Sequence, residues 1–175
     1  MPLDGLKADC FLGLGNLDEA LECYERILAV QPDAPYWVHV GFANVLERMS
    51  QPEAAIEKML VALRKEFSLG LAERVVILSQ ATIDPVNVQR SVADIALAQG
   101  SEPLSVEVGE LLISTGISSE GARIFECLIN SSSDQVPLIS RVVKAHLSAG
   151  ESRIASKKLE AVSYTHLTLP TILLV

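Results

Sequence analysis

Aromatic residues are scarce in this chain. Phe, Trp and Tyr make up 5% of the 175 residues, whereas hydrophobic residues make up 49% and charged residues 21%. The chain therefore has enough apolar material for a core, which argues against intrinsic disorder. Ala, Leu, Ile and Val must supply most of the packing, and this composition favours closely packed helices.

An excess of positive charge is also missing. Lys and Arg number 14 against 22 Asp and Glu, the formal net charge is -8, and no basic run interrupts the sequence. Most of such a surface repels a polyanion such as DNA, so we expect no nucleic-acid partner.

Cysteines and long apolar runs are few. Cys10, Cys23 and Cys127 form no CxxC pair, and their odd number makes a disulfide framework a poor interpretation, so we expect reduced thiols in a cytoplasmic protein.

The N-terminal stretch carries Asp4 and no long apolar core, so we do not expect a secretory signal. The apolar stretch at the C-terminus is far shorter than the roughly 20 residues that a membrane span needs, and no membrane segment is expected.

Prolines recur at a regular distance. Between residues 35 and 137 they stand at positions 35, 52, 85, 103 and 137, with gaps of 17, 33, 18 and 34. Proline is tolerated in the first turn of a helix and disfavoured deeper in it. This spacing therefore predicts helix starts at a fixed pitch. Gly15, Gly116 and Gly150 predict turns between helices, and the last two are again 34 residues apart.

Capping residues and apolar spacing fit the same frame. Asn16 and Ser50 are each followed three residues later by Glu, the spacing of a capping box, while Asp84 and Ser101 stand at two proline-marked helix starts. Apolar residues recur at steps of three and four, and strand-like alternation is absent from the sequence. We predict an all-α fold of ten helices in five antiparallel pairs. The expected helices are 3–14 and 17–30, 35–49 and 52–66, 70–80 and 85–99, 103–115 and 118–130, and 136–148 and 151–162.

The spacing and several residue patterns resemble the tetratricopeptide repeat (TPR), with its pattern W-x2-L-G-x2-Y…A-x3-F…P. The clearest matches are Trp37-x2-Val40-Gly41, Ala20-x3-Tyr24, Val108-Gly109, Gly121-x3-Phe125 and Ala155-x3-Leu159. This resemblance implies a right-handed α-α superhelix of about five pairs. The third unit fits only by its length and by Pro85, which leaves another α-solenoid of paired helices as an alternative. The expected repeat units are approximately 1–34, 35–69, 70–101, 102–135 and 136–161.

The residue patterns of common catalytic sites are not recognisable. A catalytic base needs a nucleophile and an orienting carboxylate within reach, and His39 and His146 stand on the first helices of separate repeat units. Packing or surface roles are the simpler interpretation for both. Glu107 and Glu110 resemble a solvated helix face more than a pair of acid–base carboxylates. We expect no catalytic residues, no cofactor, no metal site and no enzymatic activity.

The TPR resemblance places candidate partner-binding residues on the first helix of each pair, which lines the concave side in that family and usually holds extended peptides. Arg141 and Lys144 lie one helical turn apart and would hold an acidic group of a partner. The alternative is that they pair with Glu107 and Glu110 of the preceding unit. The full candidate set is Val38, His39, Phe42, Val106, Glu107, Glu110, Ser140, Arg141 and Lys144.

These observations predict a non-catalytic scaffold that binds a protein or peptide on its concave face. The alternative is that the array is the substrate-positioning or dimerisation portion of a larger bacterial enzyme. The TPR resemblance allows a glycosyltransferase, a sulfotransferase or a methyltransferase in that role.

Residues 162–175 differ in composition from the rest of the chain. Val162–Thr171 resembles one reading frame of the transposon-end adapter used to build sequencing libraries. We therefore expect 162–175 to be a non-native tail on a fragment of metagenomic origin, and the repeat array to occupy residues 1–161.

Overall fold

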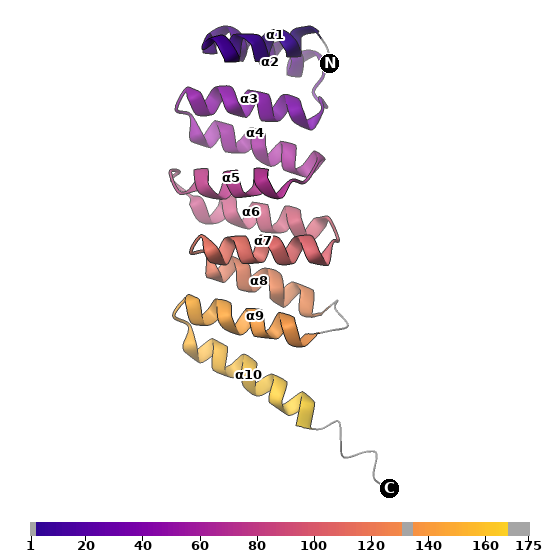
Figure 1. Cartoon of the computed structure of the whole chain (residues 1–175), viewed down its shortest axis with the longest axis vertical. Helices are drawn as coiled ribbons and strands as arrows, with labels where there is room; N and C mark the ends of the chain where they lie inside the picture. Colours follow the sequence, from indigo (N-terminus) through magenta and orange to yellow (C-terminus); the bar gives the residue numbers. More distant parts are fainter. Residues whose placement is uncertain (1–2, 131–134, 168–175) are drawn as a thin grey trace. The chain divides into compact units, whose positions relative to one another are not determined.

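The structure is a computed structural model that describes residues 3–130 and 135–167, and every regular element in those residues is an α-helix. The chain divides into two compact units, residues 1–95 (unit 1) and residues 96–175 (unit 2), with the division inside the sixth helix. Figure 1 labels the helices in chain order. The all-α prediction is confirmed. The helices are α1 (Leu3–Leu14), α2 (Leu17–Val30), α3 (Tyr36–Arg48), α4 (Pro52–Lys65), α5 (Leu69–Ser79), α6 (Pro85–Ala98), α7 (Glu102–Ser114), α8 (Ser118–Ile129), α9 (Gln135–Ser148) and α10 (Ser152–Leu167).

The predicted helix boundaries lie within one residue of the observed ones for α1 to α9. The exception is α10, which continues to Leu167, five residues beyond the expected end. The sequence contains neither Gly nor Pro between Ser152 and Thr168, so no residue with strong helix-breaking character stands before Pro170. The expected adapter-derived tail lies partly in this helix and partly outside the described residues.

Successive helices pack against each other within each unit. In unit 1, α1 packs on α2, α2 on α3, α3 on α4 and α4 on α5, and in unit 2, α7 packs on α8, α8 on α9 and α9 on α10. The core consists mainly of Ala, Val, Leu and Ile, as the composition indicates. The largest fully buried side chains are Tyr24, Phe125 and Met59.

Four helix-to-helix turns share one backbone motif. A residue with positive φ follows the first helix, and the next residue donates its N–H to the carbonyl five positions earlier, as Asn16 does to Phe11 at 2.9 Å. This is the Schellman arrangement, in which glycine is favoured because it lacks a Cβ. Gly15, Gly116 and Gly150 occupy three of the four positions, with φ of 84°, 88° and 76°.

Ser50 occupies the fourth position, with φ of 59°. The prediction that Ser50 caps α4 is wrong, because Gln51 is the N-cap residue and donates its N–H to the Leu46 carbonyl at 2.9 Å. The turn geometry therefore overrides the capping-box spacing. Asp84 does cap α6, since its Oδ1 accepts the Asn87 N–H at 3.2 Å. Asn16 and Ser101 are in N-cap positions without a side-chain hydrogen bond.

Replacing Ser50 with glycine should stabilise the protein. A non-glycine residue in the left-handed region costs roughly 1 kcal/mol, and Ser50→Gly removes that cost at an exposed position. We expect the free energy of unfolding, measured by urea denaturation with circular dichroism, to rise by about 0.5–1 kcal/mol. Ser156→Gly, at an exposed position in the interior of α10, is the control and should destabilise by about 0.5 kcal/mol. A loss of stability in Ser50→Gly would contradict the assignment of strain to this turn.

Small residues set the distance between neighbouring helix backbones. A Cβ added to Gly121 of α8 would lie 2.8 Å from the carbonyl oxygen of Gly109 in α7 and 2.6 Å from Ile113 Cγ1. A Cβ on Gly109 would lie 2.7 Å from the Phe125 ring, and one on Gly41 would lie 2.2 Å from the Tyr24 hydroxyl. A methyl group at any of the three positions would force its neighbours to shift, and at Gly121 one of those neighbours is backbone.

Alanine substitutions should separate packing from helix propensity. Gly121→Ala places a methyl group against backbone, which cannot rotate away, so we expect a loss of about 1–3 kcal/mol in the free energy of unfolding. Gly13→Ala in α1 meets nothing within 4 Å and should stabilise by about 0.5–1 kcal/mol. Urea denaturation of both variants tests the prediction, and equal effects in the two would contradict it.

Candidate functional site

The structure places the candidate residues of the second repeat in the core of unit 1. Val38, His39 and Phe42 of α3 are buried, with exposed fractions of 0%, 5% and 6%. This corrects the expectation that they line an open face. The reason lies in the neighbouring helices, because the Phe42 ring stacks on Tyr24 of α2 at 6.0 Å between centroids, and Lys58 of α4 lies 5.5 Å from the same ring.

His39 is a buried histidine without a hydrogen-bond partner in geometric range among the described residues. Burial lowers its pKa from the ordinary value of 6.5, and the positive charges of Lys65 and Lys58 lower it further, while the Ala34 backbone and Asp33 oppose the shift. The imidazole therefore stays neutral to a lower pH in the folded protein than in the unfolded chain. Among the interpretations left open by the sequence, the structure favours packing.

The neutral state of His39 makes stability depend on pH. Its folded pKa lies below its unfolded pKa, so the unfolded chain binds more protons and the free energy of unfolding falls as the pH drops below about 6.5. His39→Leu, which keeps an apolar side chain at the site, removes this contribution. We expect urea denaturation between about pH 7.5 and about pH 5.5 to show a smaller loss of stability in His39→Leu than in the wild type. Parallel stability curves for the two proteins would contradict it.

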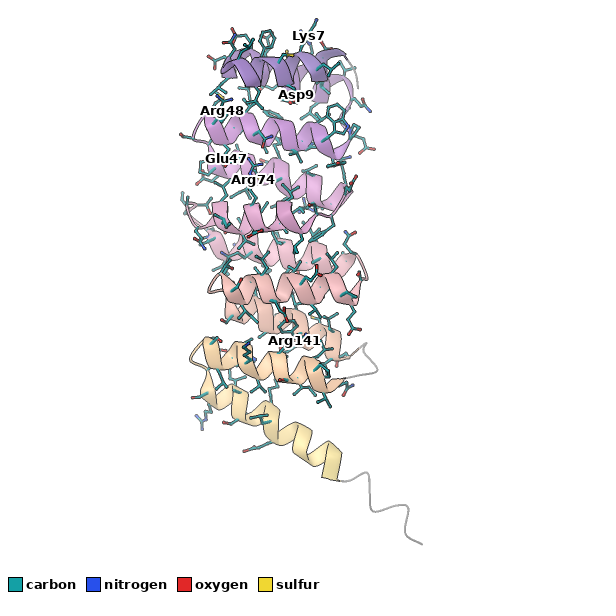
Figure 2. The ribbon with its side chains drawn as sticks, in the orientation of Figure 1. Lys7, Asp9, Glu47, Arg48, Arg74 and Arg141 are labelled. Carbon is teal, nitrogen blue, oxygen red and sulfur yellow. The ribbon has the colours of Figure 1, made fainter. Side chains whose placement is uncertain are left out.

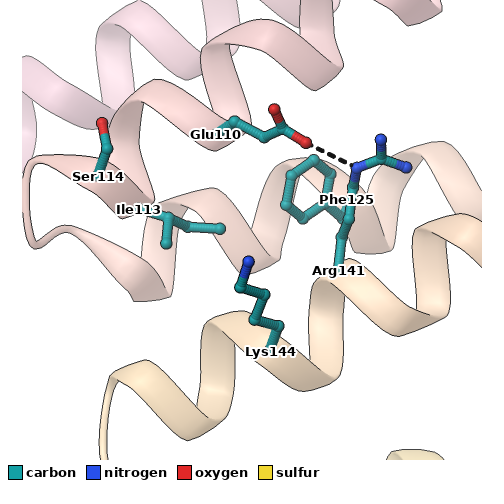
Figure 3. Close-up of a pocket in the computed structure, with 6 residues that line it drawn as sticks. All are labelled: Glu110, Ile113, Ser114, Phe125, Arg141 and Lys144. Atoms are coloured by element: carbon teal, nitrogen blue, oxygen red, sulfur yellow. Dashed lines mark hydrogen bonds and ion pairs between the residues drawn. The ribbon is translucent and has the colours of Figure 1, made fainter.

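Four of the six candidate residues of unit 2, namely Val106, Glu110, Arg141 and Lys144, come together at the surface between α7 and α9. A hollow of about 350 Å³ lies between these helices, and its lining includes Glu110 from α7 and Arg141 and Lys144 from α9. The buried Phe125 ring of α8 lies at the hollow, and the Lys144 amine projects into it (Figure 3). Ile113 and Ser114 complete the lining.

A second hollow of about 380 Å³ lies along the same two helices. It also includes Arg141, together with Val106 and Leu138, and it is closed at the helix starts by Glu102, Pro103 and Pro137. Arg141 therefore belongs to both hollows, and we call the two together the α7–α9 groove. Glu107 and Ser140 are exposed on the same helices but line neither hollow.

The charges of the α7–α9 groove are partly compensated. The Arg141 Nε donates to Glu110 Oε1 at 2.9 Å (Figure 3). For Arg141, the alternative of a pair with an acidic residue of the preceding repeat unit therefore holds. Lys144 is exposed and makes no ion pair with any described residue. The first hollow thus carries one carboxylate and two cations, and its uncompensated charge is the Lys144 amine.

Sequence reasoning missed much of the lining of the groove. Phe125 matches the A-x3-F pattern and Pro103 and Pro137 mark helix starts, so their general positions were available from the sequence. Their contribution to a surface depends on how far α7 and α9 stand apart over α8. The distance between α7 and α9 is set by how both helices pack on α8, and the sequence pattern does not contain it.

The buried His146 belongs to a polar network whose other members are partly exposed. Its Nδ1 lies 2.7 Å from Glu151 Oε2 and its Nε2 lies 3.5 Å from Glu126 Oε1, while Lys158 Nζ reaches Glu126 at 2.8 Å. Burial tends to raise the pKa of Glu126, but Lys158 and His146 outweigh it and the pKa is lowered. Both ring nitrogens of His146 face carboxylates, so the network ties α8, α9 and α10 together rather than presenting a base to a substrate.

The described residues offer neither a metal site nor a membrane-spanning helix. They contain no cluster of three or more His, Cys, Asp or Glu side chains placed to hold a metal ion. Likewise, no described helix is both long and apolar enough to cross a membrane.

Two features define the architecture, namely the close approach of Gly109 and Gly121 inside the α7–α8 pair and the recurring glycine turn between paired helices. Both features lie at positions where the TPR resemblance of the sequence predicts small residues or a turn. The chain is similar to the solved structure of the MamA protein, with 16% identity and a TM-score of 0.45 over 87% of this chain and 84% of that chain. It is also similar to a tetratricopeptide repeat protein from Parabacteroides merdae, with 15% identity and a TM-score of 0.41 over 90% of this chain and 77% of that chain. A third similar structure contains the nearly identical TPR-like repeats of a Podosopora anserina kinesin light chain, with 15% identity and a TM-score of 0.40 over 92% of each chain. Neither a family model nor a curated protein matches the sequence.

Proposed function

We propose that the chain is a non-catalytic protein-binding scaffold and that the α7–α9 groove holds an extended peptide carrying an acidic group. The observation that carries this proposal is the pair of adjoining hollows that share Arg141. Two adjoining hollows along parallel first helices suit a chain of several residues better than a compact small molecule.

The chemistry of the groove favours a carboxylate. Lys144 projects into the first hollow with no intramolecular partner among the described residues, and Arg141 lies one turn before it on α9. A carboxylate entering the hollow would pair with Lys144 and compete with Glu110 for the Arg141 guanidinium. The half-buried Val106 and Ile113 offer apolar contact to neighbouring residues of the same peptide.

Selection from a random peptide library displayed on phage tests this function. We expect the selected peptides to be enriched in Asp, Glu or a free C-terminal carboxylate. If a folded protein selects no peptide, the scaffold proposal fails, and the alternative of an array that serves a larger enzyme gains support.

Charge variants locate the binding site. Lys144→Gln should weaken binding of a selected acidic peptide roughly threefold to tenfold, as expected for an exposed ion pair of about 1 kcal/mol. Glu110→Gln should strengthen binding, because it releases Arg141 for the peptide. Lys157→Gln, which removes the same charge from an exposed position on α10, is the matched control. Equal losses in Lys144→Gln and Lys157→Gln, measured by fluorescence anisotropy, would contradict the assignment of the groove.

A further inference from the structure

Unit 1 contains a groove of its own between α3 and α5. One hollow of about 370 Å³ includes Tyr36 and Val40 of α3 and Glu66 at the end of α4, and a second of about 270 Å³ includes Glu73, Ile77 and Leu78 of α5. Both hollows share Gly70 and Arg74 of α5. We call this surface the α3–α5 groove, and none of its residues was among the candidates from the sequence.

An ion pair stands where the two hollows meet. The Nε of Arg74 donates to Glu47 Oε2 at 3.1 Å, and a terminal nitrogen of Arg74 donates to the same oxygen, so this pair is internally neutral (Figure 2). Glu66 and Glu73 make no ion pair with any described residue, and both are exposed. The charge that the groove offers to a partner is therefore negative, opposite in sign to that of Lys144 in unit 2.

Each hollow combines one such carboxylate with exposed apolar surface. The first has Glu66 beside Tyr36, whose exposed fraction is 37%, and the second has Glu73 beside Ile77, whose exposed fraction is 55%. A Lys or Arg side chain needs both parts, because its aliphatic stem covers apolar surface while its charged end reaches a carboxylate or water. The Tyr36 ring adds a face on which a cation can rest.

The spacing of the hollows sets the spacing of the two basic side chains. The α5 residues that line them are centred about three residues apart, or roughly 4 Å, whereas Val40 and Glu47 of α3, one in each hollow, are roughly 10 Å apart along their helix, so the spacing of the hollows lies between these two distances. Alternate residues of an extended peptide project to the same side about 6.6 Å apart. Gly70 lies in both hollows, and a Cβ there would meet only Ser68 Oγ at 4.0 Å, so packing does not require glycine and a peptide backbone can approach α5 closely at this point.

We propose that the α3–α5 groove binds an extended peptide segment with two basic side chains at alternate positions. This inference goes beyond the proposed function, because it concerns a different unit and a partner of opposite charge. One side chain occupies the Tyr36–Glu66 hollow and the other occupies the Ile77–Glu73 hollow, with the Arg74–Glu47 pair between them.

Three fluorescein-labelled peptides of Gly, Ser and Ala test the proposal with the whole chain. The first carries two lysines at alternate positions, the second carries the two lysines side by side, and the third carries glutamates in place of the alternate lysines. We expect saturable anisotropy changes at low salt for the first peptide, binding at least threefold weaker for the second, and none for the third. Binding of the first peptide should weaken as the salt concentration rises from about 20 mM to about 300 mM.

Matched variants separate the groove from the general negative charge of the chain. The double variant Glu66→Gln/Glu73→Gln should lose roughly tenfold in affinity for the alternate-lysine peptide. Glu22→Gln/Glu25→Gln, which removes the same charge from exposed positions on α2, should retain the affinity, and circular dichroism should show unchanged helix content in both.

The result is decisive in either direction. Failure of the alternate-lysine peptide to bind, equal affinity for the adjacent-lysine peptide, or equal losses in the two double variants would overturn the proposal. Lys144→Gln should leave the affinity for this peptide unchanged, so a failure here is distinguishable from a failure of the acidic-peptide function of unit 2.

Discussion

The contact on which unit 2 depends most is the approach of α7 and α8 at two glycines. The Cα of Gly121 stands so near the Gly109 carbonyl that a single added carbon would lie 2.8 Å from that oxygen. This approach brings the Phe125 ring under α7, against the position where Gly109 has no side chain. The ring then lies at the hollow between α7 and α9. A surface feature is thus determined by the absence of side chains at two interior positions.

Both units bridge neighbouring first helices in the same way, although their sequences differ there. Glu47 pairs with Arg74 in unit 1, and Glu110 pairs with Arg141 in unit 2. In each case the pair stands between two hollows and neutralises its own charge. In the binding that we propose, the selectivity of each groove is left to the remaining charged residues, which are Lys144 and Glu102 in one unit and Glu66 and Glu73 in the other. The charge of these remaining residues can therefore differ between grooves without disturbing the ion pair that joins the two first helices.

The fold was predictable from sequence because its signals are local. Proline at helix starts, glycine in the turns and apolar residues at steps of three and four fixed nine helices to within one residue. The two helices of the third unit, which lacked the TPR residues, are still present as α5 and α6 because those general signals suffice. Ser50 shows the limit of local reasoning, since one residue satisfies a capping pattern and a turn position, and only the backbone conformation distinguishes them.

The site was less predictable because it depends on distances between helices. Arg141 and Lys144 are close in sequence, so their proximity to each other was available, whereas their place beside Phe125 was not. Phe42 and His39 were expected on an open face, but Tyr24 from the preceding helix covers Phe42, and the surrounding core buries His39. The burial of one helix face depends on the side chains of its neighbours, which a positional pattern does not contain.

The bridging pairs also have a consequence for the binding that we propose. Glu110 already accepts a hydrogen bond from the Arg141 guanidinium, so an incoming carboxylate would exchange one ion pair for another of similar energy. The net gain at Arg141 would be small, and the affinity would depend on Lys144 and the apolar contacts. Glu110 would therefore act as an internal competitor that lowers the affinity for an acidic peptide. A groove built in this way would favour weak complexes over permanent ones.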